Sequence, residues 1–149
     1  MAFVVFGFYG TGKTTFCKEN PTLAKEYDSE YFRFVPDMKQ NLEKDLQTDI
    51  ILFINRLEFF ENYTFTGKNQ VQLIFLPKNK NVFRDILYKR NTQPEFIKDI
   101  LKEYPAMIRS IQQYAKKYQI PFITLDKNEY ISQYKNKILE MARFYYEHY

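Results

Sequence analysis

The sequence predicts an α/β fold in which a mostly parallel sheet is covered by helices on both faces. Short apolar runs flanked by polar turns recur along the chain, and such runs are typical of parallel strands buried on both sides. Between these runs, apolar residues recur every three or four positions, which is the pattern of amphipathic helices. Strands that alternate with helices in this way favour a parallel sheet.

Five apolar runs are the predicted strands. Four of them cover residues 3–6, 50–54, 71–76 and 122–125, and a weaker candidate covers residues 24–28. The predicted helices cover residues 14–19, a stripe from Met38 to Leu46, and the stripes over 96–104, 107–118 and 131–145. Pro105 predicts a start or a kink for the helix over 107–118. Asp126 and Glu129 have the spacing of a capping box, which predicts that the last helix opens there.

The stretch of residues 78–104 is long, helical and polar on one side, and it contains no predicted strand. It begins at a strand end, where ligands of parallel sheets bind. We therefore expect this stretch to be a mobile lid over a ligand site.

Composition indicates one globular domain over residues 1–149, with 45% hydrophobic and 27% charged residues. The net charge of +4 suits an anionic substrate and is too small to require a nucleic-acid backbone as partner. The single cysteine, Cys17, excludes an internal disulfide and fits a reducing compartment. No segment approaches the roughly 18 apolar residues of a membrane span, and the N-terminal residues lack the pattern of a signal peptide. We expect a cytoplasmic protein without a membrane partner.

The most specific motif follows the first predicted strand. Residues 7–14 read Gly-Phe-Tyr-Gly-Thr-Gly-Lys-Thr, which fits the phosphate-binding pattern G-x-x-x-x-G-K-[ST] without a mismatch. Glycines allow the backbone to approach phosphate oxygens closely, and the N–H groups of the loop and of the following helix point at the anion. Lys13 is expected to bridge the β- and γ-phosphates, and the Thr14 hydroxyl to bind Mg²⁺. The predicted nucleotide-binding residues are Gly7, Tyr9, Gly10, Thr11, Gly12, Lys13, Thr14 and Thr15.

With this loop directly after the first strand, the chain resembles P-loop kinases of the nucleoside and nucleotide kinase type, particularly the short phage-type members. The resemblance covers most of the chain in layout, and its motifs are specific at the phosphate loop and less so in the lid. It implies a three-layer P-loop fold with five parallel strands in the order 2-3-1-4-5. It also implies ATP and Mg²⁺ as cofactors and a lid that carries basic residues.

Acidic residues at strand ends are the candidates for the metal and for proton transfer. Asp28 ends the second predicted strand, where a carboxylate would accept the proton of an acceptor hydroxyl or hold Mg²⁺. The third strand departs from the family pattern, because Asn55 stands where an acid is expected and an amide brings no charge to Mg²⁺. Asp28 or Glu58 would then take over the metal, or catalysis is compromised. Arg56 is either an acceptor contact or a solvated charge.

Two arginines in the lid segment are the candidates for stabilising the transferring phosphoryl group. The resemblance favours Arg84 and Arg90, whose forked donors suit phosphate oxygens. They lie about 120° apart on an ideal helix, so they would flank an anion rather than stack on it. Lys80 shares a face with Arg84. The alternative for each is an ordinary solvated helix face.

The resemblance implies an ATP-dependent phosphotransferase that acts on a nucleoside or a nucleoside monophosphate. Candidate acceptor contacts follow the second strand at Phe32, Arg33, Phe34 and Asp37. A modified base in DNA is an alternative acceptor, since the C-terminal stretch is basic and rich in tyrosine. A nucleotide-binding regulatory module with weak or no catalysis is the third hypothesis, and Asn55 is its main support. Arg109 points either at the site or at water, whereas Cys17 is expected to be a small core residue and His148 to be solvated.

Overall fold

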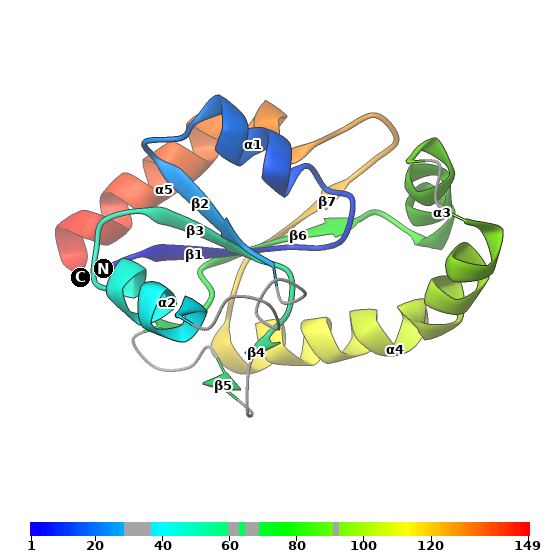
Figure 1. Cartoon of the computed structure of the whole chain (residues 1–149), viewed down its shortest axis with the longest axis horizontal. Helices are drawn as coiled ribbons and strands as arrows, with labels where there is room; N and C mark the ends of the chain where they lie inside the picture. Colours follow the sequence, from blue (N-terminus) through cyan, green and yellow to red (C-terminus); the bar gives the residue numbers. More distant parts are fainter. Residues whose placement is uncertain (29–36, 60–62, 65–68, 91–92) are drawn as a thin grey trace.

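The computed structural model describes residues 1–28, 37–59, 63–64, 69–90 and 93–149, and of residues 58, 59, 63 and 64 only the backbone. Its main sheet has five strands, all parallel, in the spatial order β2-β3-β1-β6-β7 (Figure 1). Their bounds are β1 Phe3–Gly7, β2 Ala24–Tyr27, β3 Ile51–Ile54, β6 Leu73–Pro77 and β7 Phe122–Leu125. Numbered along the chain, these five strands have the order 2-3-1-4-5, which confirms the predicted sheet.

Helices cover both faces of this sheet and produce three layers. Figure 1 shows α1 and α5 on one face, α2 and α4 on the other, and α3 beside the far end of the sheet. The helices are α1 Lys13–Glu19, α2 Met38–Leu46, α3 Lys80–Lys89, α4 Pro94–Tyr118 and α5 Lys135–His148, with a 3₁₀ helix over Ile131–Tyr134. The α/β class and the helices after β1 and β2 are therefore as predicted.

The central strand β1 explains why the strands read as continuous apolar runs. Val4 and Phe6 pack into the core beneath α2, α3 and α4, whereas Phe3 and Val5 pack into the core beneath α1 and α5. All five residues of β1 are buried. Because successive side chains of a strand point to opposite faces, a strand covered on both sides must be apolar throughout.

The edge strand β7 differs from its prediction as a buried strand. Phe122 is 48% exposed, and only Leu125 of this strand is buried. β7 pairs with β6 alone and lies at the border of the sheet. An apolar run therefore predicted the strand correctly but did not reveal its position at the edge.

A single helix, α4, replaces the two helices predicted on either side of Pro105. It runs for 25 residues from Pro94 to Tyr118 with Pro105 in its interior, and it bends along its length (Figure 1). An internal proline removes one backbone hydrogen bond and costs about 3 kcal/mol. Burial of Tyr104, Ile111 and Ala115 along one face of the helix offsets that cost, so the helix continues.

The last helix begins later than the predicted capping box. The backbone N–H of Asp126 donates to Glu129 Oε1 at 2.8 Å, which is one half of a capping box. However, residues 126–130 are not helical: residues 127 and 128 form a turn, and Asn128 has a φ of 64°. The 3₁₀ helix begins only at Ile131. The expected contact is therefore formed in a turn, and the prediction of a helix start at Asp126 was wrong.

Two short strands were not predicted. β4 Glu58–Phe59 and β5 Tyr63–Thr64 pair antiparallel as a separate two-stranded sheet. Their two-residue length leaves too little pattern for the sequence to indicate them. No helix in the described part of the chain is long and apolar enough to cross a membrane.

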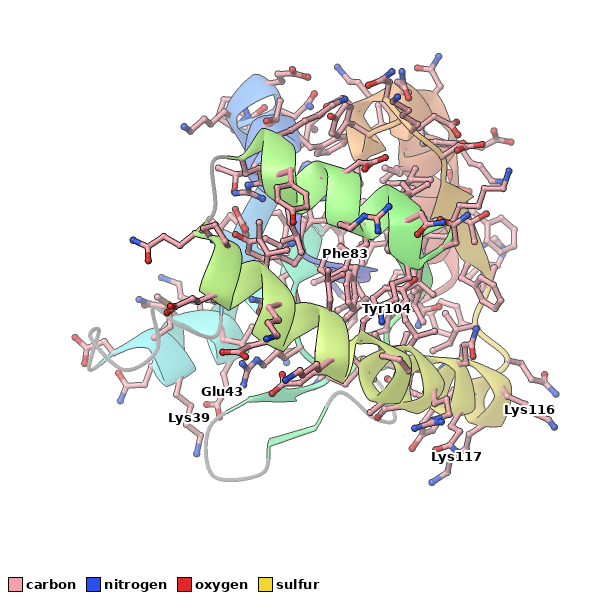
Figure 2. All side chains as sticks on the ribbon, turned by 90° about the vertical axis from the view of Figure 1, so that its right-hand side faces the viewer. Lys39, Glu43, Phe83, Tyr104, Lys116 and Lys117 are labelled. Atoms are coloured by element: carbon pink, nitrogen blue, oxygen red, sulfur yellow. The ribbon has the colours of Figure 1, made fainter. Side chains whose placement is uncertain are left out.

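An aromatic cluster joins the predicted lid to residues 7–14, the predicted phosphate loop. Phe83 of α3 stacks on Tyr104 of α4 with ring centroids 5.3 Å apart, and Figure 2 shows the two side chains between these helices. Phe8 of the loop packs edge-on against both rings, at 5.0 Å from Phe83 and 5.9 Å from Tyr104. The cluster fixes α3 beside the loop. In the same view, Lys116 and Lys117 project outward at the end of α4.

Candidate functional site

A cavity of about 350 Å³ lies at the carboxyl ends of the central strands, between the phosphate loop, β2 and α3. Such edges are where parallel sheets bind ligands. Its lining joins six of the predicted nucleotide-binding residues, three residues at or next to the ends of β2 and β3, three residues of the predicted lid segment, and Tyr130. The lining residues are Tyr9, Gly10, Gly12, Lys13, Thr14, Thr15, Glu26, Asp28, Asn55, Ile86, Lys89, Arg90 and Tyr130.

The loop takes a conformation that requires glycine at two positions. Gly10 has a φ of 80° and Gly12 a φ of 97°, which other residues rarely adopt. Thr11, buried beneath the loop, donates its hydroxyl to the Phe8 carbonyl at 2.6 Å. The Thr11 carbonyl accepts a hydrogen bond from the Ile131 N–H at 3.0 Å. The predicted residue Thr11 therefore shapes the loop from below and does not line the cavity.

Lys13 is buried beneath the loop with its amine at the cavity. It is 7% exposed, and its Nζ lies 3.3 Å from the Phe8 carbonyl oxygen. A Cβ at Gly7 would lie 2.6 Å from Lys13 Cγ, so the glycine makes room for this side chain. Burial lowers the pKa of Lys13 below its ordinary value, and the charges of Glu26 and Asp28 act against that shift. A buried cation of this kind gains from an anionic ligand.

Thr14 is the second residue of α1, and its hydroxyl is directed at β2. Thr14 Oγ1 donates to Glu26 Oε2 at 2.7 Å. The sequence analysis selected Asp28 and missed Glu26, although strand alternation indicates that Glu26 faces α1. Ala24 of β2 packs into the core beneath α1, and Glu26 lies two residues further, on the same face.

Asp28 and Asn55 meet where β2 and β3 end. The strands pair Tyr27 with Ile54, so Asp28 and Asn55 are the next neighbours in the register. Asn55 Nδ2 donates to Asp28 Oδ1 at 3.0 Å. The residue that replaces the expected acid thus supports the acid on the neighbouring strand.

The predicted lid segment contributes Arg90, Lys89 and Ile86 to the cavity. The Arg90 guanidinium carbon lies 4.7 Å from the centre of the Tyr9 ring, and Ile86 packs one turn earlier against Gly10. Lys89 Nζ donates to Asn128 Oδ1 at 2.6 Å. Arg84 is exposed on α3 and is not among the described lining residues. Of the two predicted arginines, only Arg90 therefore lines the cavity. Lys89 was not predicted, but its position next to Arg90 at the end of α3 could have indicated it.

The remaining candidates lie elsewhere. Asp37 and Arg56 are exposed, and neither is among the described lining residues of the cavity. Arg109 is exposed on α4, and His148 stacks on Phe144 at 4.1 Å. Cys17 packs partly buried against the core beneath α1 and α5, as predicted. The acceptor candidates Phe32, Arg33 and Phe34, and the side chain of Glu58, lie outside the described residues.

The oxygen atoms at the cavity fit a magnesium ion that also binds phosphate. The Thr14 hydroxyl and the carboxylates of Glu26 and Asp28 line the same space. The described residues contain no group of three or more acidic, histidine or cysteine side chains that would hold a metal by themselves. Mg²⁺ is commonly held by one or two carboxylates together with substrate phosphates and water, so the donor set matches a nucleotide-bound ion.

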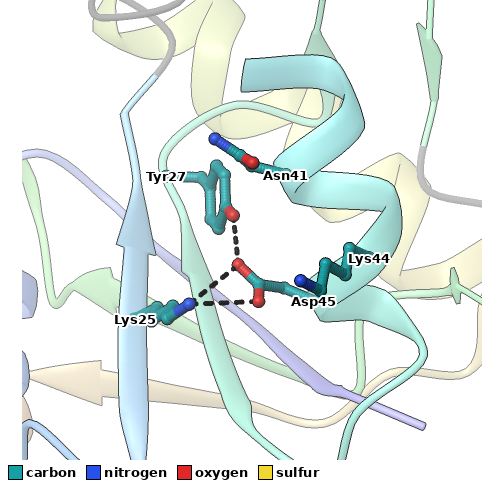
Figure 3. Close-up of a pocket in the computed structure, with 5 residues that line it drawn as sticks. All are labelled: Lys25, Tyr27, Asn41, Lys44 and Asp45. Carbon is teal, nitrogen blue, oxygen red and sulfur yellow. Dashed lines mark hydrogen bonds and ion pairs between the residues drawn. The ribbon is translucent and has the colours of Figure 1, made fainter. Parts of the chain in front are cut away.

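A second hollow of about 340 Å³ lies on the opposite face of β2 (Figure 3). Lys25, Tyr27, Asn41, Lys44 and Asp45 line it. Lys25 Nζ lies 3.1 Å from Asp45 Oδ1, and the Tyr27 hydroxyl donates to Asp45 Oδ2. These groups join β2 to α2 and satisfy one another, which is the arrangement of a structural contact.

No protein-family model matches this chain, and no curated protein sequence matches it at a significant level. The resemblance to P-loop kinases therefore depends on the phosphate-loop residues and the sheet order.

Proposed function

We propose that the protein is an ATP-dependent phosphotransferase that moves the γ-phosphoryl group to a nucleoside or nucleoside monophosphate. One observation carries the proposal: a single cavity is lined by Lys13 and Thr14 of the loop, Asp28 of the strand end and Arg90 of the lid. These are the residue types that phosphoryl transfer requires, namely cations for the phosphates, a metal ligand and a proton acceptor.

The loop would hold the triphosphate, with Lys13 against the β- and γ-phosphates. When Mg²⁺ is bound, it neutralises charge on the phosphate oxygens. Thr14 and one of the two β2 carboxylates, Glu26 or Asp28, would hold this ion. Arg90 would donate to the oxygens of the transferring group, where charge develops.

In the transfer step, the acceptor hydroxyl oxygen forms a bond to the γ-phosphorus. The bond from the γ-phosphorus to the bridging oxygen breaks, and its electron pair leaves with ADP. The proton of the hydroxyl passes to the Asp28 carboxylate, which Asn55 orients through the 3.0 Å hydrogen bond. Catalysis in this scheme consists of positioning and charge stabilisation.

The test is an acceptor screen with γ-labelled ATP. The protein is offered nucleosides, nucleoside monophosphates and DNA that carries modified bases, and the label is followed into each acceptor. Label in a nucleoside or nucleotide is expected, and label in DNA alone would favour the alternative acceptor. Lys13→Ala should abolish ATP binding, whereas Lys18→Ala, which changes an exposed lysine of the same helix, should not. Retained ATP affinity in Lys13→Ala would contradict the proposal.

Asn55 favours a second candidate, a nucleotide-binding regulatory module with little or no transfer. Its amide closes β3, the strand beside β1, where the family pattern has an acid. ATP binding without label transfer to any acceptor would favour the regulatory module, provided that bound ATP is hydrolysed no faster than free ATP.

A further inference from the structure

We propose that Glu26 is the carboxylate that orients the Thr14 hydroxyl to bind magnesium, and that Asp28 acts on the acceptor. This inference rests on the proposed function, because it assigns the metal half of the same site. It assigns the metal to Glu26, which lies two residues before the predicted acid, Asp28.

The hydrogen bond between Thr14 and Glu26 carries the first step of the argument. A threonine hydroxyl has one proton to donate and two lone pairs to offer. Thr14 Oγ1 gives its proton to Glu26 Oε2 at 2.7 Å, a length typical of a hydroxyl bound to a carboxylate. The lone pairs of the hydroxyl then remain for a cation, and its orientation is fixed. Glu26 is thus a positioning residue for the metal ligand, and its charge faces the same ion.

The second step concerns the separate partners of the two acids. Glu26 pairs with Phe53 in the strand register, one residue before the sheet ends, and it lies beneath α1. Asp28 lies beyond the last pair and accepts from the Asn55 amide. An amide that donates to a carboxylate orients it but brings no charge. Glu26 therefore contacts α1, the helix that follows the loop, whereas Asp28 lies beyond the end of the sheet.

The experiment measures how much Mg²⁺ tightens ATP binding. The dissociation constant of ATP is determined by calorimetry with Mg²⁺ and with EDTA, for the unaltered protein and for Glu26→Gln, Asp28→Asn and the control Glu19→Gln. Glu19 is an exposed acid on the same helix as Thr14. Circular dichroism verifies the fold of each variant. A second readout follows Mn²⁺ in the protein–ATP complex by electron paramagnetic resonance.

In Glu26→Gln, the gain in ATP affinity that Mg²⁺ produces over EDTA should be about 10- to 100-fold smaller, as is usual when a group that orients a metal ligand is removed. Its affinity for ATP in EDTA should stay the same or improve, since a negative charge near the phosphates is gone. Asp28→Asn and Glu19→Gln should keep the gain. Loss of the gain in Asp28→Asn but not in Glu26→Gln would overturn the inference while leaving nucleotide binding intact. Absence of ATP binding by the unaltered protein would instead remove the proposed function, and this inference with it.

Discussion

Arg90, which caps the C-terminus of α3, lies over the ring of Tyr9 in the predicted phosphate loop, with its guanidinium carbon 4.7 Å from the ring centre. An arginine over an aromatic face is attracted to it and is also held in place by it. Tyr9 in turn packs against Phe96 of α4, with ring centroids 6.5 Å apart. A variable position of the loop motif thus orients a cation of the lid toward the cavity.

Arg90→Ala should reduce phosphoryl transfer by about a thousandfold or more, the usual effect of an arginine that stabilises the transition state. ATP affinity should change much less, because the charge is needed mainly during transfer. Single-turnover kinetics and ATP binding measured on the same samples check this. Arg84→Ala is the matched control and should stay within about twofold. An equal loss in both variants would mean that the lid rearranges to bring both arginines to the phosphate.

Asp28→Asn should slow transfer by about 10²- to 10⁴-fold, the range that a general base contributes. The amide keeps the size of the side chain but does not accept a proton. Asp37→Asn alters an exposed acid outside the described cavity lining and should leave the rate unchanged. A full rate in Asp28→Asn would show that the acceptor proton goes elsewhere, for example to water.

Lys13 should make both nucleotide binding and stability depend on pH, in opposite directions. Burial holds its pKa below the ordinary value of 10.5, whereas phosphates raise it on binding. As the pH rises through the interval between the lowered pKa and 10.5, ATP affinity should fall. Over the same interval the unfolded chain binds more protons than the folded one at this residue, so its contribution to the free energy of unfolding should rise with pH. Calorimetric titration of the unaltered protein with ATP checks the first sign, and denaturant unfolding compared with Lys13→Met checks the second. The argument would be contradicted if neither ATP affinity nor the contribution of Lys13 to the free energy of unfolding changed with pH.

Tyr27→Phe should lower the free energy of unfolding by about 1.5–3 kcal/mol, the range for a hydrogen bond to a charged group. The Tyr27 hydroxyl donates to Asp45, which is only 9% exposed. In the variant, Lys25 would be the remaining side-chain partner of this carboxylate among the described residues. Tyr88→Phe removes a hydroxyl from a side chain that is 57% exposed and should have no measurable effect. Urea unfolding provides the comparison. An unchanged midpoint for Tyr27→Phe would mean that water replaces the lost donor.

The five strands were predictable because apolar runs are local patterns, and their order followed from the family resemblance. The exposure of Phe122 was not predicted from its apolar run, because such a run looks the same in a central strand and in an edge strand, although the predicted order placed this strand at the edge. The continuity of α4 through Pro105 depends on contacts of Tyr104, Ile111 and Ala115 that no local pattern contains. In both cases tertiary packing decided the outcome.

The site shows the same limit. The loop residues were predictable from one motif, but their partners come from distant parts of the chain. Glu26 meets Thr14 because α1 packs over β2, and Arg90 meets Tyr9 because an aromatic cluster holds α3 in place. Strand alternation could have indicated Glu26. The exclusion of Arg84 from the cavity lining depends on the rotation of α3, which spacing alone leaves open.

The hydrogen bond from the Ile131 N–H to the Thr11 carbonyl has a consequence for synthesis on the ribosome. The loop is translated more than a hundred residues before the segment that restrains its backbone. A nascent chain that ends before Tyr130 has the complete motif but lacks this restraint, and it also lacks Tyr130 against Gly12. Under the proposed function, we therefore expect tight nucleotide binding to be acquired late in translation, when the growing chain brings the 3₁₀ helix back to the loop.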